Sequence, residues 1–210
     1  MFKAALFDLD GVVLNTEEQY SKLWKSLGEK YHPEIVHFEL RIKGMTLVQI
    51  LDQYFAGNDE AQRKIINALN DFEKNMSYDY IPGFQQFITR LRAEGVKTAV
   101  VTSSNKDKMS NVYKTHPEFK RQFDAILTSE DFAKSKPDPD CYLKAVQRFG
   151  LQPSECVGFE DSVNGLKAVK AAKMFCVGLA TTNPREVVEQ YADIVTDNFV
   201  GFSLNRKSTV

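Results

Sequence analysis

The chain has 210 residues, of which 43% are hydrophobic and 26% charged, and its formal net charge is -1. This length and composition are typical of a globular protein with one domain, or with one domain and an insertion. The net charge argues against a basic surface for nucleic acid. No apolar run reaches the ~20 residues that span a bilayer.

The apolar stretch at the start of the chain is short and is soon interrupted by charged residues, so we expect no signal peptide. We therefore expect a cytoplasmic monomer with neither a nucleic-acid nor a membrane partner. Three cysteines, Cys141, Cys156 and Cys176, lie among apolar residues and lack the spacing of a metal or redox site. We expect them to be buried.

The first predicted element is a strand over 3–8. Three segments with apolar residues at helical spacing follow it, without a clear strand between them. They contain Tyr20, Leu23, Trp24 and Leu27; Leu47, Ile50, Leu51 and Tyr54; and Ile65, Leu69 and Phe72. This pattern predicts a small helical bundle inserted after the first strand, and the turn at 81–83 closes it.

Helices and strands alternate through the rest of the chain. Predicted strands cover 96–102, 123–129, 156–160, 174–180 and 192–196. Between them, apolar spacing indicates helices around 84–91, 142–149 and 166–173. Such alternation predicts an α/β protein whose parallel sheet has helices on both faces.

Polar residues stand where several of these strands end. Ligands of parallel α/β sheets bind beyond the carboxyl ends of the strands, so these residues are candidates for a single site. In chain order they are Asp8, Thr102 and Ser103, Lys136 in the loop after the third strand, and Glu160 with Asp161.

The segment FDLDG places Asp8 and Asp10 two residues apart. Side chains alternate along an extended segment, so both carboxylates can point the same way, and Gly11 permits a tight departure from the strand. With Asp161 nearby, the carboxylates would repel one another unless a hard cation binds, and Mg²⁺ is the usual choice beside phosphates. Lys136 and the hydroxyls suit a phosphoryl group, so the pattern favours phosphoryl transfer.

Each motif also has an ordinary structural explanation. Thr102, Ser103 and Ser104 could cap the next helix, and Glu160 and Asp161 could cap another. Four such motifs in order at strand ends favour the functional interpretation.

The segments FDLDGV, VVTSS, KSKPDP and GFEDSVNG resemble the four motifs of the haloacid dehalogenase superfamily, in its order and across nearly the whole chain. The pattern is most similar to the branch of β-phosphoglucomutases and sugar-phosphate phosphatases. The resemblance implies a Rossmann-like core of residues 1–14 and 82–210, and an inserted α-helical cap domain of residues 15–81.

The resemblance also implies roles for the motif residues. Asp8 would be the nucleophile that forms an aspartyl-phosphate, and Asp10 would protonate the leaving alkoxide and then accept a proton from water. The implied Mg²⁺ site consists of the Asp8 and Asp161 side chains, the Asp10 backbone carbonyl, and Glu160 acting through water or by orienting the ligands. The implied catalytic residues are Asp8, Asp10, Thr102 and Lys136, and the implied phosphate-binding residues are Asp8, Thr102, Ser103 and Lys136.

The cap is the part of such enzymes that selects the substrate. Leu47 stands where β-phosphoglucomutases have an arginine for the second phosphate of a bisphosphate, and leucine cannot make that contact. Glu17, Arg41 and Lys43 are the candidate cap contacts.

We therefore expect a Mg²⁺-dependent phosphatase that acts on small phosphorylated metabolites, above all sugar phosphates. The alternative function is that of a β-phosphoglucomutase, which interconverts β-glucose 1-phosphate and glucose 6-phosphate. A third interpretation is a non-catalytic phosphate-sensing module.

Overall fold

The computed structural model describes residues 2–43 and 45–204. Its centre is a six-stranded sheet with the order β3-β2-β1-β4-β5-β6, in which every neighbouring pair is parallel. The strands are β1 (Ala4–Phe7), β2 (Lys97–Val101), β3 (Ala125–Leu127), β4 (Cys156–Glu160), β5 (Phe175–Leu179) and β6 (Ile194–Thr196). All six lie within the predicted strand segments, and the predicted α/β fold is confirmed.

Helices make up most of the remaining chain. They are α1 (Glu17–Tyr31), α2 (Phe38–Arg41), α3 (Leu47–Tyr54), α4 (Asp59–Asn75), α5 (Phe84–Ala93), α6 (Lys106–Thr115), α7 (Phe119–Gln122), α8 (Asp140–Arg148), α9 (Val163–Ala171) and α10 (Arg185–Val188), with short 3₁₀ turns at Ser129–Asp131 and Pro153–Glu155. Within the described ranges, no helix has the length and apolarity needed to cross a membrane.

The periodicity of the sequence does not delimit every helix. Both α2 and α7 have only four residues, which is too short for a periodic pattern to emerge. The buried face of α6 contains Met109 and Val112 but is interrupted by a buried lysine, Lys108. That lysine weakens the apolar pattern and turns out to belong to the site described below.

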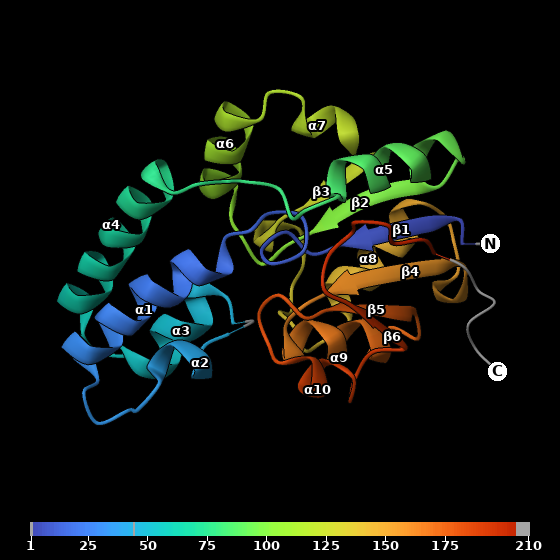
Figure 1. The fold of residues 1–210 in the computed structure, drawn as a ribbon. Helices are drawn as coiled ribbons and strands as arrows, with labels where there is room; N and C mark the ends of the chain where they lie inside the picture. Colours follow the sequence, from blue (N-terminus) through green and yellow to red (C-terminus); the bar gives the residue numbers. More distant parts are fainter. Residues whose placement is uncertain (1, 44, 205–210) are drawn as a thin grey trace.

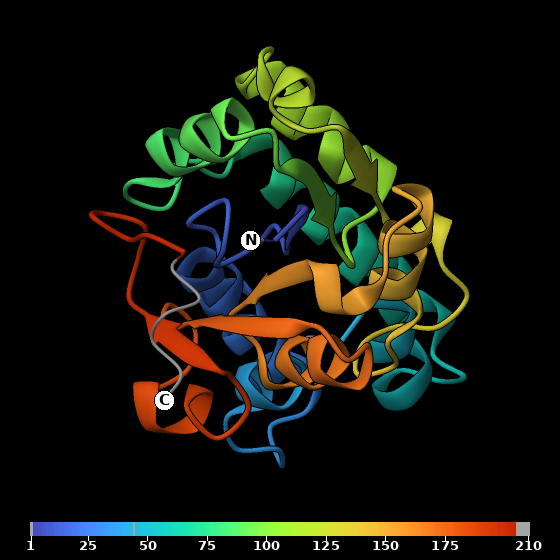
Figure 2. The same ribbon diagram turned by 90° about the vertical axis from the view of Figure 1, so that its right-hand side faces the viewer.

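Side chains of β1 alternate between two cores. Ala5 and Phe7 pack in the cluster that contains apolar residues of α5, α6 and α7, whereas Ala4 and Leu6 pack in the cluster of α8 and α9. Figure 2 shows α5, α6 and α7 on one side of the sheet and α9 on the other. The three cysteines are buried, as expected, and free.

The helices α1 to α4 have an apolar core of their own, which includes Trp24, Phe38, Ile50 and Ile65. In Figure 1 they form a group beside the sheet, and the strand arrows of β1, β2 and β4 point toward that group. The carboxyl ends of the strands therefore face the helical group.

Two adjacent segments join the helical group to the sheet. The Asn15 amide donates to the Asp79 carbonyl at 2.7 Å, and the Ile81 amide donates to the Val13 carbonyl at 3.0 Å. The outgoing and returning chains are thus bonded side by side.

The chain order reverses between β1 and β4. From β1 the chain moves outward through β2 and β3, and it then crosses to β4 on the other side of β1. This switch point leaves a crevice beyond the carboxyl ends of β1 and β4, which is where ligands of such sheets bind. Asp8 follows β1 directly and Asp161 follows β4, so the topology brings both to the crevice.

Candidate active site

The turn after β1 begins with Asp8, whose amide continues the sheet by donating to the Phe159 carbonyl at 3.0 Å. Gly11 then turns the chain with a φ of +76°. A Cβ atom at Gly11 would lie 2.2 Å from Oδ2 of Asp161. Only glycine combines this backbone conformation with such a close approach, so Gly11 brings the first turn against the carboxylate that follows β4.

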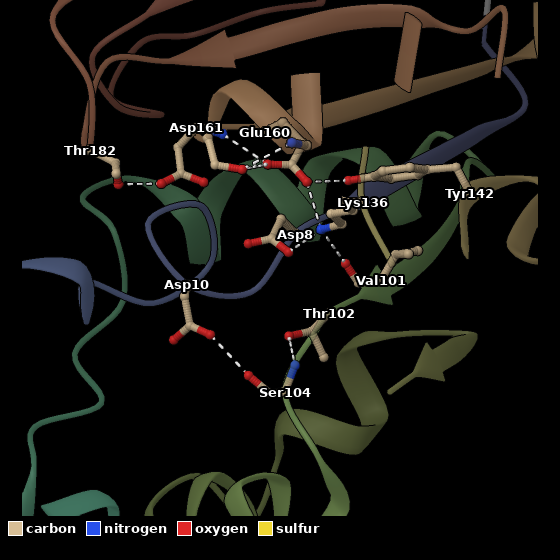
Figure 3. A network of polar contacts seen from close by, with 12 residues as sticks. Asp8, Asp10, Val101, Thr102, Ser104, Lys136, Tyr142, Glu160, Asp161 and Thr182 are labelled. Atoms are coloured by element: carbon tan, nitrogen blue, oxygen red, sulfur yellow. Dashed lines mark hydrogen bonds and ion pairs between the residues drawn. The ribbon is translucent and has the colours of Figure 1, made fainter. Parts of the chain in front are cut away.

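Lys136 is the central cation of the site. Its Nζ lies 2.5 Å from Asp8 Oδ1 and 2.6 Å from Glu160 Oε1, and it donates to the Val101 carbonyl at 3.2 Å (Figure 3). The side chain is 3% exposed, and its peptide bond to Pro137 is cis. The loop after β3 therefore carries one buried ammonium group into the middle of the carboxylates.

Glu160 is completely buried, and both of its carboxylate oxygens are occupied by donors. Oε1 accepts from the Tyr142 hydroxyl at 2.7 Å as well as from Lys136. Oε2 accepts from the Asp161 amide at 3.2 Å and from the Ser162 hydroxyl at 3.3 Å. Glu160 is not one of the described residues that line the cavity at this site. Its contacts fit a residue that orients Lys136 and Asp161.

Asp161 completes a carboxylate group suited to a cation. One ligand oxygen from each of Asp8, Glu160 and Asp161 lies within 4.8 Å of the others. Thr182 donates its hydroxyl to Asp161 Oδ2, and Asn183 donates to the Asp161 carbonyl at 2.9 Å. Asp8 and Asp161 offer hard oxygen donors of the kind that Mg²⁺ prefers, with Glu160 beside them, so the residues present fit the expected cation.

Burial and neighbouring carboxylates together raise the pKa values of two carboxyl groups in the site. Burial, followed by the neighbouring Glu160 and Asp10, raises the pKa of Asp8 to about 7, even though Lys136 opposes the shift. Burial and the charges of Glu17, Glu160 and Asp8 raise the pKa of Asp161 well above its usual value. The protein's own cations therefore leave this carboxylate cluster under-compensated.

Thr102 and Ser103 follow β2 at the edge of the same crevice. The Thr102 amide donates to the Leu127 carbonyl at 3.0 Å, and the Thr102 hydroxyl oxygen accepts from the Ser104 amide at 3.0 Å, so the hydroxyl proton is the donor left for a ligand. The Ser103 hydroxyl oxygen is buried without a hydrogen-bond partner in the described structure. A buried hydroxyl without a partner is unfavourable, and an anion bound beside it would supply the missing acceptor.

The alternative capping roles fall to other residues. Asn105 caps α6 by accepting from the Lys108 amide at 2.9 Å, and Ser162 caps α9 by accepting from the Gly165 amide at 3.0 Å. Thr102, Ser103, Glu160 and Asp161 are therefore not needed as helix caps.

Asp10 lies in a separate network beside this cluster. Its carboxylate accepts from the Thr16 hydroxyl at 2.5 Å, from the Ser104 hydroxyl at 3.0 Å, and from Lys108 Nζ at 2.5 Å to each oxygen. None of these partners of Asp10 was predicted from the sequence. Of the three partners, only Lys108 could have been suspected of burial from the sequence, because its helical spacing places it on the same face of α6 as Met109 and Val112.

A cavity of about 900 Å³ lies between the site and the helices α1 to α4. The predicted residues that line it are Asp8, Asp10, Glu17, Lys43, Leu47, Thr102, Ser103, Lys136 and Asp161. Arg41 is exposed at the end of α2, and the structure does not bring it to this cavity. Thus two of the three predicted cap contacts face the site.

Glu17 and Lys43 differ in their surroundings. Burial and the nearby Asp10 raise the pKa of Glu17 to about 7, although Lys43 and Lys108 oppose the shift. Lys43 Nζ donates to the Thr182 carbonyl at 2.9 Å, and the Lys43 carbonyl accepts from Asn164 at 3.4 Å. Lys43 therefore connects the segment before α3, through hydrogen bonds, to two segments at the carboxyl edge of the sheet.

Comparison with known proteins gives consistent matches. The family model described as haloacid dehalogenase-like hydrolase matches residues 5–179. A β-phosphoglucomutase of Bacillus subtilis (strain 168) is 29% identical over 93% of this chain and 92% of that protein. A validoxylamine A 7'-phosphate phosphatase of Streptomyces hygroscopicus subsp. limoneus is 31% identical over 93% of each. A solved β-phosphoglucomutase from Clostridium difficile has a TM-score of 0.80 at 22% identity, over 97% of this chain and 94% of that one, which shows a shared fold.

Metal-free protein is expected to lose stability as the pH rises through the window from about 4 to about 7. The pKa values of Asp8 and Glu17 rise to about 7 on folding from ordinary values of 3.8 and 4.5. In this window the folded state holds protons that the unfolded chain has released, so the free energy of unfolding falls as pH rises. Thermal unfolding with a chelator at about pH 5 and about pH 8 measures the effect.

Mg²⁺ should raise the unfolding temperature more at the higher pH, because the carboxylates it neutralises are then ionised. Asp161→Asn should shrink this difference, whereas Asp52→Asn, at an exposed position on α3, should leave it unchanged. Equal Mg²⁺ shifts at both pH values would contradict the assignment of the cation to this cluster.

Gly165→Ala is expected to destabilise the protein by roughly 1–3 kcal/mol. An exposed helical glycine replaced by alanine would give the opposite sign, a gain of up to about 1 kcal/mol. Here the new Cβ would lie 2.0 Å from Glu160 Oε2 and would displace a buried carboxylate. Denaturant unfolding measures the change, with Lys167→Ala at an exposed position on α9 as the control. A gain in stability would show that Glu160 is not held as described.

Proposed function

The chain belongs to the haloacid dehalogenase-like hydrolase family, and we propose that it is a Mg²⁺-dependent phosphatase of small phosphomonoesters, above all sugar phosphates. The observation that carries the proposal is the Asp8 carboxylate, held by Lys136 at the switch point of the sheet with Asp10 two residues away. Phosphoryl transfer depends mainly on positioning and on charge stabilisation, and both are available there.

In the first step, an Asp8 carboxylate oxygen forms a bond to phosphorus, and the bond from phosphorus to the ester oxygen breaks. Asp10 donates a proton to the departing alkoxide, which leaves as an alcohol. The product on the protein is an aspartyl-phosphate at Asp8. Lys136 and the hydroxyls of Thr102 and Ser103 hold the phosphoryl oxygens.

In the second step, water attacks the phosphorus of the aspartyl-phosphate. Asp10, now a carboxylate, accepts a proton from that water, and the bond between phosphorus and the Asp8 oxygen breaks. Inorganic phosphate leaves, and both aspartates return to their starting states. The alkyl group and the phosphate thus leave in separate steps, so one group can serve as acid and then as base.

The residues that would hold Mg²⁺ are Asp8 and Asp161 through their side chains and Asp10 through its backbone carbonyl. When bound, the cation supplies positive charge against the phosphoryl oxygens and the carboxylates. Glu160 would serve this group indirectly, because its own oxygens already accept from Lys136, Tyr142 and the Asp161 amide.

We propose that residues 15–81 form a cap domain over a core of residues 1–14 and 82–210. The separate apolar core of α1 to α4 and the paired linking segments support this division. A cap over the cavity would exclude bulk water, which strengthens the electrostatic interactions within it.

The cations around the cavity favour hydrolysis over mutase activity, because a mutase must also hold the second phosphate of a bisphosphate. Its lining includes no arginine among the described residues, and Leu47 contributes an apolar wall. The four lysines of the lining already have partners: Lys43 with Thr182, Lys108 with Asp10, Lys134 with Asp138, and Lys136 with Asp8. A second phosphate would therefore compete with the partners of Lys43, Lys108 and Lys136, whereas the exposed Lys134 has only a surface ion pair. Neutral hydroxyl groups would not compete with these partners.

Two other functions are tested by the same assay. Similarity to a β-phosphoglucomutase keeps mutase activity as the alternative. A phosphate-sensing module that lacks turnover is the third candidate, and a carboxylate that accepts phosphate would suit it as well.

The deciding experiment screens a panel of phosphorylated metabolites for phosphate release with Mg²⁺. Asp8→Asn should lower turnover by more than about a thousandfold, because it removes the nucleophile. The exposed Asp52→Asn variant is the matched control. Turnover by Asp8→Asn at the wild-type rate would overturn the assigned nucleophile.

A second arm separates the alternatives. The protein is incubated with β-glucose 1-phosphate and a trace of the 1,6-bisphosphate. Formation of glucose 6-phosphate without free phosphate would identify a mutase and overturn the proposal. Absence of any turnover across the panel would favour the sensing module.

A further inference from the structure

Lys108 is a buried lysine that none of the recognised motifs contains. It lies in the first turn of α6 and its side chain is 4% exposed. A lysine on a helix usually extends its ammonium group into water, because burying an ion is costly unless it is paired. Its burial therefore calls for a specific partner.

That partner is the Asp10 carboxylate. Nζ of Lys108 lies 2.5 Å from each of its two oxygens, so the ammonium bridges the carboxylate symmetrically. The Thr16 hydroxyl donates to Oδ1 and the Ser104 hydroxyl donates to Oδ2. Three donors from three different segments fix both the position and the rotation of this carboxylate, which borders the cavity.

A cap residue completes the setting of Lys108. Its Nζ lies 4.5 Å from the centre of the Tyr20 ring on α1, a distance at which a cation is attracted to the aromatic face. The Tyr20 hydroxyl donates to Glu73 on α4 at 2.8 Å. The ammonium is therefore held between the Asp10 turn and α1, and Tyr20 is itself bonded to α4.

We propose that Lys108 is a positioning residue that holds the Asp10 carboxylate where it accepts a proton from the water attacking the aspartyl-phosphate. The inference rests on the proposed function, because it assumes that Asp10 acts as the base. Lys108 itself touches neither the phosphoryl group nor the water in this assignment. A displacement of about 1 Å in a catalytic group can lower a rate about a hundredfold, so one ion pair can matter greatly.

The test uses p-nitrophenyl phosphate, whose leaving group departs without a proton. Its kcat/KM reports formation of the aspartyl-phosphate, and its kcat reports hydrolysis of that intermediate when hydrolysis is the slower step. Lys108→Met should lower kcat about tenfold or more, leave kcat/KM within about twofold, and produce a burst of one p-nitrophenol per protein molecule. Lys108→Arg, which keeps the charge and the donors, should recover part of kcat.

Controls separate this role from a structural one. Lys106→Met, at an exposed position two residues away on α6, should match wild type in both parameters. Lys108→Gln, an uncharged donor, provides a second variant if Lys108→Met unfolds, and thermal unfolding monitors both. Equal losses in kcat and kcat/KM, or no loss in either, would overturn the proposal.

Asp10→Asn distinguishes failure of this inference from failure of the proposed function. If Asp10→Asn produces the burst and Lys108→Met does not, the base is correctly assigned and the role of Lys108 is wrong. If Asp10→Asn keeps the wild-type kcat, the base is wrongly assigned and the role of Lys108 falls with it.

Discussion

The site depends on one buried ion pair, in which the Lys136 ammonium lies between the carboxylates of Asp8 and Glu160. Asp8 and Asp161 meet at the switch point because the sheet places the ends of β1 and β4 side by side. Carboxylates gathered in a buried crevice repel one another, and one lysine offsets only part of that repulsion. Tyr142 and Ser162 complete the shell of Glu160, and Gly165 leaves the space that this carboxylate occupies.

A second lysine gives the neighbouring aspartate an environment of its own. Lys136 reaches Asp8 from the loop after β3, whereas Lys108 reaches Asp10 from α6. Although the two aspartates are separated by a single residue, they are held by different elements. Asp8 is therefore fixed to the sheet, while the partners of Asp10 include Thr16, just before α1, and a lysine whose ammonium lies over the Tyr20 ring.

Much of this arrangement is predictable from the sequence because it follows from local patterns. Apolar strands that end in polar residues predict both the sheet and the residues at its carboxyl edge. The partners of Lys108 and Tyr142 escape such reasoning, because each of these polar groups lies on the buried face of a helix and contacts a residue far away in the chain. Arg41 illustrates the opposite failure, since a sequence pattern cannot show which way a side chain leaves a four-residue helix.

The helical group meets the core on both sides of the carboxylates. On one side Tyr20 covers Lys108 next to Asp10, and on the other Lys43 binds the carbonyl of Thr182, whose hydroxyl donates to Asp161. A molecule in the cavity therefore borders both Asp10 and Asp161. A shift of α1 to α4 that moves Tyr20 and Lys43 would alter both contacts, and this would link the shape of the cavity to the geometry of the carboxylates.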